Sequence, residues 1–167
     1  SVTGVQTCAL PICTLLVRGL SSAQNSAKSH VYPLYSDMRL IKLVDFQPII
    51  SAILLFQYHR LVSKIVDHVK RTNLAGKRVL ITSCAFGNVI PRVVEAAIGA
   101  GAERVLIADI IQNELVHAKT KLTQYANKVE YIEDNATALK QRDGVAAANI
   151  MFFLLHELPH ELKGRAL

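Results

Sequence analysis

A turn containing one glycine, followed about 20 residues later by an acidic side chain, is the pattern in this chain that suits nucleoside binding. The β-rich run 78–83 predicts a strand that leads through Gly87 into a predicted helix over 89–99. The first N–H groups of such a helix, and the positive end of its dipole, point at a ligand. Small residues at Ser83 and Ala85 would let that ligand approach the backbone.

The acidic side chain is Asp109, which ends a second predicted strand and lies 22 residues after Gly87. A carboxylate suits ribose because it accepts two hydrogen bonds from a vicinal diol. The alternative is a plain strand–helix–strand unit, in which Asp109 caps the next helix and Gly87 only makes a turn.

Strands and helices alternate along the chain, which predicts an α/β fold with a parallel sheet and right-handed crossovers. The predicted strands are 78–83, 104–109, 129–133 and 147–154, and the predicted helices are 49–70, 89–99, 112–125 and one beginning at Leu158. The fourth strand is apolar on both faces, as in the centre of a parallel sheet.

Composition excludes several classes of protein. With 167 residues, 51% of them hydrophobic, the chain can form one domain with a substantial core. The apolar run 43–56 is shorter than the roughly 20 residues that span a bilayer. Three cysteines without a CxxC pair argue against a disulfide scaffold or zinc ribbon. The net charge of +6 selects no partner by itself.

The segment 79–87 resembles motif I of class I S-adenosylmethionine-dependent methyltransferases, whose usual form is an acidic residue followed by a GxGxG turn. Here Ile81 replaces the acidic residue, and Ser83 and Ala85 replace two glycines. Within that class, three stretches resemble the rhodoquinone-biosynthesis methyltransferase-like proteins (RquA). They are Cys84 to Gly87 with Pro91-Arg92, Asn135 to Leu139, and Phe152 to Glu157 with Pro159.

The resemblance implies a Rossmann-like class I methyltransferase fold, three-layer αβα with a parallel sheet, truncated after the fourth strand. It implies an enzyme that uses S-adenosylmethionine as an amino donor, with manganese, and converts ubiquinone, a lipid quinone, to rhodoquinone. Donor-binding residues would be Ser83, Cys84, Ala85, Gly87, Asn88, Asp109, Ile110, Asn135 and Ala136. The methionine moiety would lie near the turn, the ribose at Asp109 and the adenine at Asn135, where many methyltransferases carry aspartate.

We expect three regions. Residues 1–30 begin like translated sequencing-adapter sequence and are expected to be a disordered leader. Residues 31–75 form an N-terminal helical segment, and 76–167 form a partial S-adenosylmethionine-binding domain. Basic residues interrupt the apolar stretch 32–58, so it could rest on anionic lipid or simply pack on the sheet. We therefore expect a cytoplasmic protein with peripheral contact to the inner membrane.

The run from His156 to His160 matches the H-E-x-x-H zinc protease pattern. Pro159 lies inside it and would disrupt the helix that must carry both histidines. We instead expect His156 and Glu157 at the carboxyl end of the fourth strand, as catalytic acid/base or cation-binding groups. The alternative is that both side chains cap the next helix and face solvent.

Two other functions are consistent with the sequence. One is an ordinary methyltransferase of a small apolar molecule. The other is a basic nucleic-acid-binding module, which would need aromatic residues interleaved with Lys and Arg. Because only 6% of residues are aromatic and none is Trp, we expect no nucleic-acid partner.

Overall fold

A computed structural model describes residues 57–140, 146–158, 160–164 and 166, together with Arg39, Lys42, Asp45 and Phe46. The expected leader 1–30 and most of the N-terminal segment lie outside the described residues. Among the described residues, no helix is both long and apolar enough to cross a membrane.

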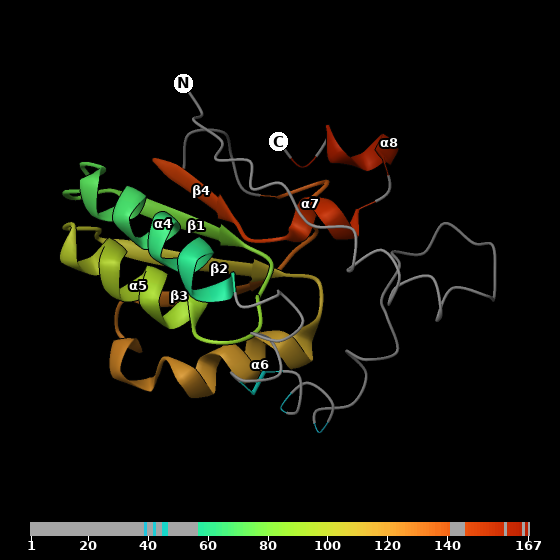
Figure 1. Ribbon diagram of the computed structural model, residues 1–167, viewed down its shortest axis with the longest axis horizontal. Helices are drawn as coiled ribbons and strands as arrows, with labels where there is room; N and C mark the ends of the chain where they lie inside the picture. The colour runs from blue at the N-terminus through green and yellow to red at the C-terminus, as the bar shows by residue number, and fades with distance from the viewer. Residues whose placement is uncertain are drawn as a thin grey trace.

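Four parallel strands form the sheet, in the order β3-β2-β1-β4 (Figure 1). The strands are β1 (Arg78–Thr82), β2 (Arg104–Asp109), β3 (Val129–Glu133) and β4 (Ala148–Met151). The first two strands pair in register, with Thr82 opposite Ala108. The predicted α/β fold with a parallel sheet is therefore confirmed, and the carboxyl ends of β1 and β2 lie side by side.

Three helices pack on one face of this sheet. They are α4 (Tyr58–Arg71), α5 (Val89–Gly99) and α6 (Gln112–Lys121), and α4 lies beside α5 (Figure 1). The buried residues of α4 recur at helical spacing, as the sequence predicts. They join the alternate strand residues that point to this face, including Val79, Ile81, Val105 and Ile107, in one hydrophobic cluster.

A smaller cluster lies on the opposite face of the sheet. Leu80, Leu106 and Ala108 form its buried centre, and Ile132, Leu139 and Ala146 pack against it. Because strand side chains alternate between faces, the nearly continuous apolar runs of β1 and β2 serve both clusters.

Several predicted boundaries differ from the structure. Among the described residues, the helix predicted over 49–70 begins as α4 at Tyr58, and the helix predicted from Leu158 begins as α8 (His160–Lys163). The helix predicted over 112–125 ends as α6 at Lys121, and a short 3₁₀ helix, η2 (Thr123–Tyr125), follows it. The strand predicted over 147–154 ends at Met151. Phe153 then takes a left-handed conformation with φ of 64°, and α7 (Leu154–Glu157) begins directly after it. Among the described strands β4 pairs only with β1, so it is not a central strand there.

The same region settles the H-E-x-x-H pattern. His156 belongs to α7, whereas His160 begins a separate helix, α8 (His160–Lys163). Leu158 between them has extended backbone angles. One continuous helix must carry both histidines of a zinc protease, and here they lie in separate helices, as the position of Pro159 predicts.

Candidate functional site

The loop between β1 and α5, residues 83–88, begins at the carboxyl edge of the sheet. The Ser83 N–H donates a hydrogen bond of 2.8 Å to the carbonyl of Ala108, which extends the pairing of β1 with β2 by one residue. Ser83 has φ of 74° and Gly87 has φ of 77°. The chain therefore takes glycine-like conformations at two positions of the turn, although only Gly87 is a glycine.

The Asp109 carboxylate joins the end of β2 to this loop. Its Oδ2 accepts the Cys84 N–H at 2.5 Å, and its Oδ1 accepts the Ile111 N–H at 2.8 Å. The side chain therefore reaches the loop at 83–88, as the ribose prediction requires. It also bonds to the start of the α6 segment, as the capping alternative requires. The contact with the start of α6 is observed, and the ribose contact stays a prediction.

Burial changes the pKa values of both side chains at this contact. It raises the pKa of Asp109 above the ordinary value, while the N–H donors of Cys84 and Ile111 act in the opposite direction. Burial, followed by the charges of Asp109 and Glu114, also raises the pKa of the Cys84 thiol. Since the thiolate is the nucleophilic form, Cys84 is a neutral packing group at physiological pH rather than a reactive cysteine.

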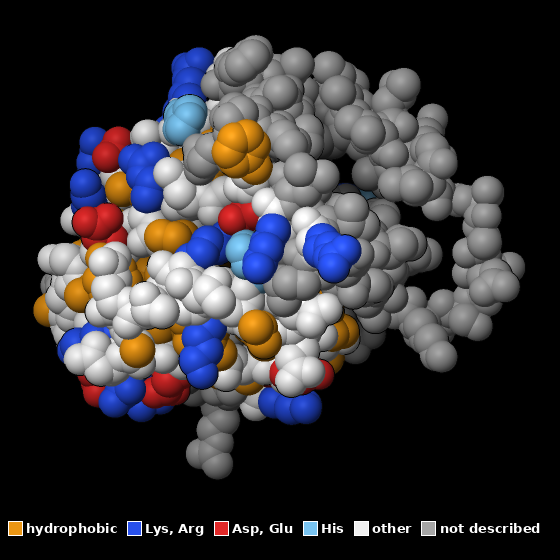
Figure 2. Space-filling view, turned by 90° about the horizontal axis from the view of Figure 1, so that it is seen from below, with side chains coloured by type: hydrophobic (Ala, Val, Ile, Leu, Met, Phe, Trp, Pro, Cys, Tyr) orange, Lys and Arg blue, Asp and Glu red, His pale blue; other side chains and the backbone are white. Residues whose placement is uncertain are grey.

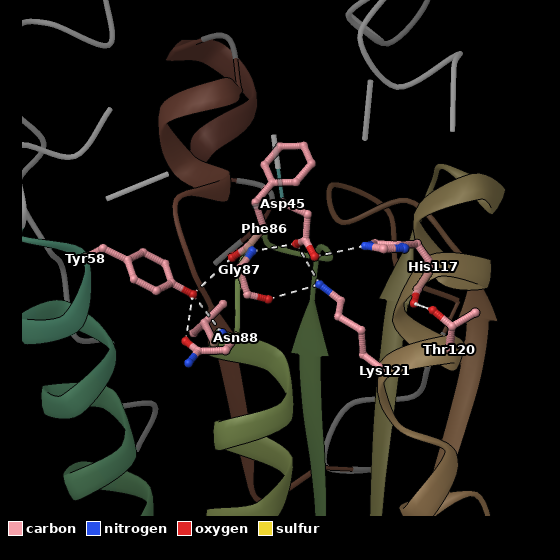
Figure 3. A network of polar contacts seen from close by, with 9 residues as sticks. Asp45, Tyr58, Phe86, Gly87, Asn88, His117, Thr120 and Lys121 are labelled. Carbon is pink, nitrogen blue, oxygen red and sulfur yellow. Dashed lines mark hydrogen bonds and ion pairs between the residues drawn. The ribbon is translucent and has the colours of Figure 1, made fainter. Parts of the chain in front are cut away.

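Tyr58 holds the loop from the side of α4. Its buried hydroxyl accepts the Val89 N–H at 2.9 Å and lies 3.2 Å from both the Phe86 carbonyl and Asn88 Oδ1 (Figure 3). The first N–H of α5 is thus satisfied by a side chain from another helix. Gly87 leaves room for this phenol, because a Cβ there would overlap the hydroxyl oxygen and lie 2.7 Å from Cζ.

Asp45 and Lys121 hold the other side of the loop. Asp45 Oδ1 accepts the Gly87 N–H at 2.6 Å and pairs with Lys121 Nζ at 2.7 Å (Figure 3). Lys121 Nζ also donates to the Gly87 carbonyl at 3.0 Å. Asp45 Oδ2 lies 3.1 Å from Nε2 of His117, whose Nδ1 is buried without a hydrogen-bond partner among the described residues.

The residues predicted to meet adenine, Asn135 and Ala136, follow β3, and the predicted donor-binding residue Ile110 follows β2. Ile110 is 41% exposed directly after Asp109. Asn135 is exposed, and its Oδ1 accepts the N–H and the hydroxyl of Thr137, both at 2.9 Å. Its neighbour Asp134 is buried and bonds to two backbone N–H groups, so it shapes the turn around Asn135 and Ala136.

The structure thus brings one group of the predicted donor-binding residues to neighbouring strand ends. The loop after β1 contributes Ser83, Cys84, Ala85, Gly87 and Asn88, and β2 contributes Asp109 and Ile110. Asn135 and Ala136 follow β3, the next strand of the sheet. The side chains of the predicted catalytic pair, His156 and Glu157, lie outside the part of the chain that the structure describes.

Sequence reasoning missed four residues of the site. Tyr58 is the first residue of α4, and Asp45 interrupts the apolar run 43–56. His117 and Lys121 lie one turn apart on α6, so they share a face. That spacing indicates a shared helix face. Their common partner, Asp45, lies more than 70 residues away in sequence, so the spacing alone does not indicate what this face binds.

The sequence pattern of the ubiE/COQ5 methyltransferase family matches residues 43–165, about three-quarters of the chain. The chain belongs to this ubiE/COQ5 methyltransferase family. The matched region contains all the donor-binding positions described above, and it also includes Asp45. Among curated proteins, none matches the chain.

Solved structures support the fold. A protein assigned as an S-adenosyl-L-methionine-dependent methyltransferase from Methanococcus maripaludis matches with a TM-score of 0.56 and 10% identity. That match covers 88% of this chain but 63% of the Methanococcus protein, so the chain spans less than two thirds of it. Magnesium protoporphyrin IX methyltransferase from Synechocystis, solved with S-adenosylmethionine bound, matches with a TM-score of 0.52 and 16% identity, covering 96% and 71%. The fold is therefore the Rossmann-like class I methyltransferase fold.

Replacing Tyr58 with Phe tests the contact between α4 and the loop. The variant leaves the buried Val89 N–H without an acceptor, which should lower the free energy of unfolding by about 1–3 kcal/mol at pH 7. Urea denaturation of both proteins measures the difference.

The same comparison predicts a pH dependence. Burial raises the pKa of Tyr58 above 10.0, so the folded state favours the neutral phenol. This contribution is complete below pH 10 and is lost as pH rises toward the folded-state pKa. The advantage of the wild type over Tyr58→Phe should therefore shrink above pH 10. An advantage that stays constant to pH 11 would contradict this assignment.

Gly87→Ala should destabilise the protein by about 2 kcal/mol or more, because it combines a positive φ with overlap against Tyr58. The matched control is Gly99→Ala, where φ is not positive and a Cβ meets no atom within 4 Å. That control should be neutral or slightly stabilising, since Gly99 is helical. Thermal unfolding compares the two; equal effects would show that the loop tolerates a side chain.

Proposed function

We propose that this protein binds S-adenosylmethionine across the carboxyl ends of β1 and β2 and transfers a group from it. The contact between Asp109 and the Cys84 N–H carries this proposal. It puts a carboxylate beside the loop where an open α/β sheet binds its ligand. The Asp109 oxygens accept the N–H groups of Cys84 and Ile111, and a carboxylate oxygen can accept more than one hydrogen bond, which suits the two ribose hydroxyls.

The occupied N–H groups of the loop support a donor without phosphates. Phosphate sites at a helix N-terminus need backbone N–H groups that point at the ligand. Here the N–H groups of Cys84, Gly87 and Val89 bond to Asp109, Asp45 and Tyr58, in that order. Two carboxylates, Asp109 and Asp45, contact the loop. A sulfonium nucleoside therefore fits it better than a nucleotide, which would bring further negative charge.

The apolar surface next to Asp109 supports an adenine site. Ile110 is exposed at the end of β2, and an aliphatic side chain there can pack against a purine ring. After β3, Oδ1 of Asn135 accepts hydrogen bonds from Thr137, so the amide nitrogen is the group that would face an adenine acceptor.

For the acceptor we propose a lipid quinone, with conversion of ubiquinone to rhodoquinone by amino transfer, as in the RquA-like proteins. Support comes from the resemblance of residues 152–157 and from aromatic rings at the exit of β4. Phe152 makes edge contacts with Phe153, at 4.5 Å between centroids, and with Tyr58, at 6.3 Å. Phe152 and Tyr58 are buried, so the half-buried Phe153 is the ring of this group that would contact a quinone. His156 and Glu157 remain the proposed acid/base residues.

The described residues do not fit the manganese ion that the RquA resemblance implies. Within that part of the chain, no three His, Cys, Asp or Glu side chains gather in a way that could hold a metal. Sites for hard cations are built from several oxygen ligands, such as the carboxylates of Asp and Glu. We therefore assign no step to a metal.

A cytoplasmic location with peripheral contact to the inner membrane remains part of the proposal. Phe46 is 59% exposed, and Arg39 and Lys42 just before it are also exposed. An apolar side chain next to basic ones suits an anionic lipid surface.

Two other functions would use the same fold. The first is methyl transfer to a small apolar substrate, favoured by membership of a methyltransferase family. Nucleic-acid binding has less support. On the face in Figure 2, Lys and Arg side chains are interspersed with acidic, hydrophobic and neutral ones across the described residues. A basic stripe is typical of a nucleic-acid interface.

Replacing Asp109 with Ala should weaken S-adenosylmethionine binding about 10- to 100-fold, because a charged group that receives the ribose hydroxyls is lost. Isothermal titration calorimetry on the folded variant measures this. The matched control is Glu130→Ala, which removes an exposed carboxylate of β3 paired with Arg104 at 3.4 Å. Equal affinity in Asp109→Ala and the wild type would remove Asp109 from the donor site.

Expression in cells that contain ubiquinone tests the acceptor. Mass spectrometry of lipid extracts should detect an amino-quinone in cells that express the protein and none in cells that express Asp109→Ala. A methylated product instead would favour the ordinary methyltransferase. If neither product forms although calorimetry shows donor binding, the quinone assignment is wrong.

A further inference from the structure

The Gly87 peptide is held at both of its polar groups by one pair of charged side chains. Its N–H donates to Asp45 Oδ1 at 2.6 Å, and its carbonyl accepts from Lys121 Nζ at 3.0 Å (Figure 3). The two side chains also bond to each other at 2.7 Å. The carboxylate, the ammonium and the peptide therefore form a closed ring of charged hydrogen bonds.

This pair differs from an ordinary surface ion pair. The side chains of Asp45 and Lys121 are 15% and 19% exposed, compared with 43% and 48% for the Arg104–Glu130 pair. Exposed pairs contribute little, whereas a largely desolvated charge that loses its partner is costly. Here both partners also bond to a backbone group, so removing either one leaves a polar group of Gly87 unsatisfied.

The pair joins three distant parts of the chain at one residue. Asp45 lies 42 residues before Gly87, and Lys121 lies 34 residues after it at the end of α6. Gly87 has no side chain with which to fix its own peptide, and it directly precedes the start of α5. The orientation of this peptide therefore depends on the Asp45–Lys121 pair.

We propose that Asp45 and Lys121 are a positioning pair for the donor-binding loop, and that the intact pair holds the Gly87 peptide in the orientation that binds the donor. This inference rests on the proposed function, because the loop must be the donor site. Coupling between two sites is reciprocal. The intact pair strengthens donor binding, and bound donor stabilises the pair by the same factor.

His117 is a further side chain that contacts the Asp45 carboxylate. Its Nε2 lies 3.1 Å from Asp45 Oδ2, so both carboxylate oxygens have partners on α6. His117 and Lys121 are one turn apart, which lets one helix face bind one carboxylate from both sides. Asp45 is therefore held by two side chains of α6 as well as by the Gly87 N–H of the loop.

The test uses Asp45→Asn, Lys121→Met and the double variant in the full chain. Asp45→Asn keeps an oxygen for the Gly87 N–H but removes the charge that pairs with Lys121. Each single variant should weaken S-adenosylmethionine binding in calorimetry about tenfold. The double variant should weaken it by about the same factor as either single one, because the two residues act as a unit.

Hydrogen exchange provides a readout that a purely structural role would not reproduce. The peptide containing Gly87 should exchange faster in Asp45→Asn, and saturating donor should slow it again, since coupling is reciprocal. If donor binds but does not slow exchange at this peptide, the coupling is refuted. Conservative Asp45→Glu and Lys121→Arg should recover part of the lost affinity; they also keep the test decisive if the first variants fail to fold.

Glu130→Gln is the matched control, because it removes the same kind of charge from the exposed pair with Arg104. It should leave donor affinity and exchange at Gly87 unchanged. The inference is overturned if Asp45→Asn and Lys121→Met also change neither quantity, or if their effects on affinity multiply in the double variant. If the wild type binds no S-adenosylmethionine, the proposed function fails and the coupling fails with it, while faster exchange in Asp45→Asn would separately show that the pair holds the loop.

Discussion

The contact between the Asp109 carboxylate and the backbone after β1 is the constraint on which the site depends. A carboxylate this buried is costly unless its oxygens receive hydrogen bonds, and the Cys84 and Ile111 N–H groups supply them. The bonds join the end of β2, the loop after β1 and the start of α6 into one unit. The parallel register brings these parts together, since Thr82 lies opposite Ala108.

Side-chain oxygens from other segments accept hydrogen bonds from backbone N–H groups of the glycine turn. Tyr58 reaches it from α4, Asp45 from the N-terminal segment and Asp109 from β2. Backbone N–H groups that could bind phosphate in other α/β proteins are thus engaged by side-chain oxygens. This arrangement explains how a loop with one glycine keeps a defined shape. Side chains from other segments supply the hydrogen bonds that the ligand supplies in a glycine-rich loop.

Membership of the ubiE/COQ5 methyltransferase family and the contacts of the loop support the same donor from independent directions. The family match rests on sequence over residues 43–165. The donor argument rests on a carboxylate at the end of β2, an exposed Ile110 and a raised thiol pKa that leaves Cys84 unreactive. Together they favour the proposed role of the loop as a donor-binding surface, with Cys84 as a packing group.

The sequence by itself determined the alternation of strands and helices, the helix over 89–99 and the place of Asp109 at a strand end. These features are local, because apolar spacing and glycine positions report on neighbouring residues. Only the tertiary structure decided that β4 ends at Met151, where Phe153 turns the chain, and that Asp45 meets Lys121. Contacts between residues more than 70 positions apart depend on how the sheet and its helices pack, and no local pattern records that packing.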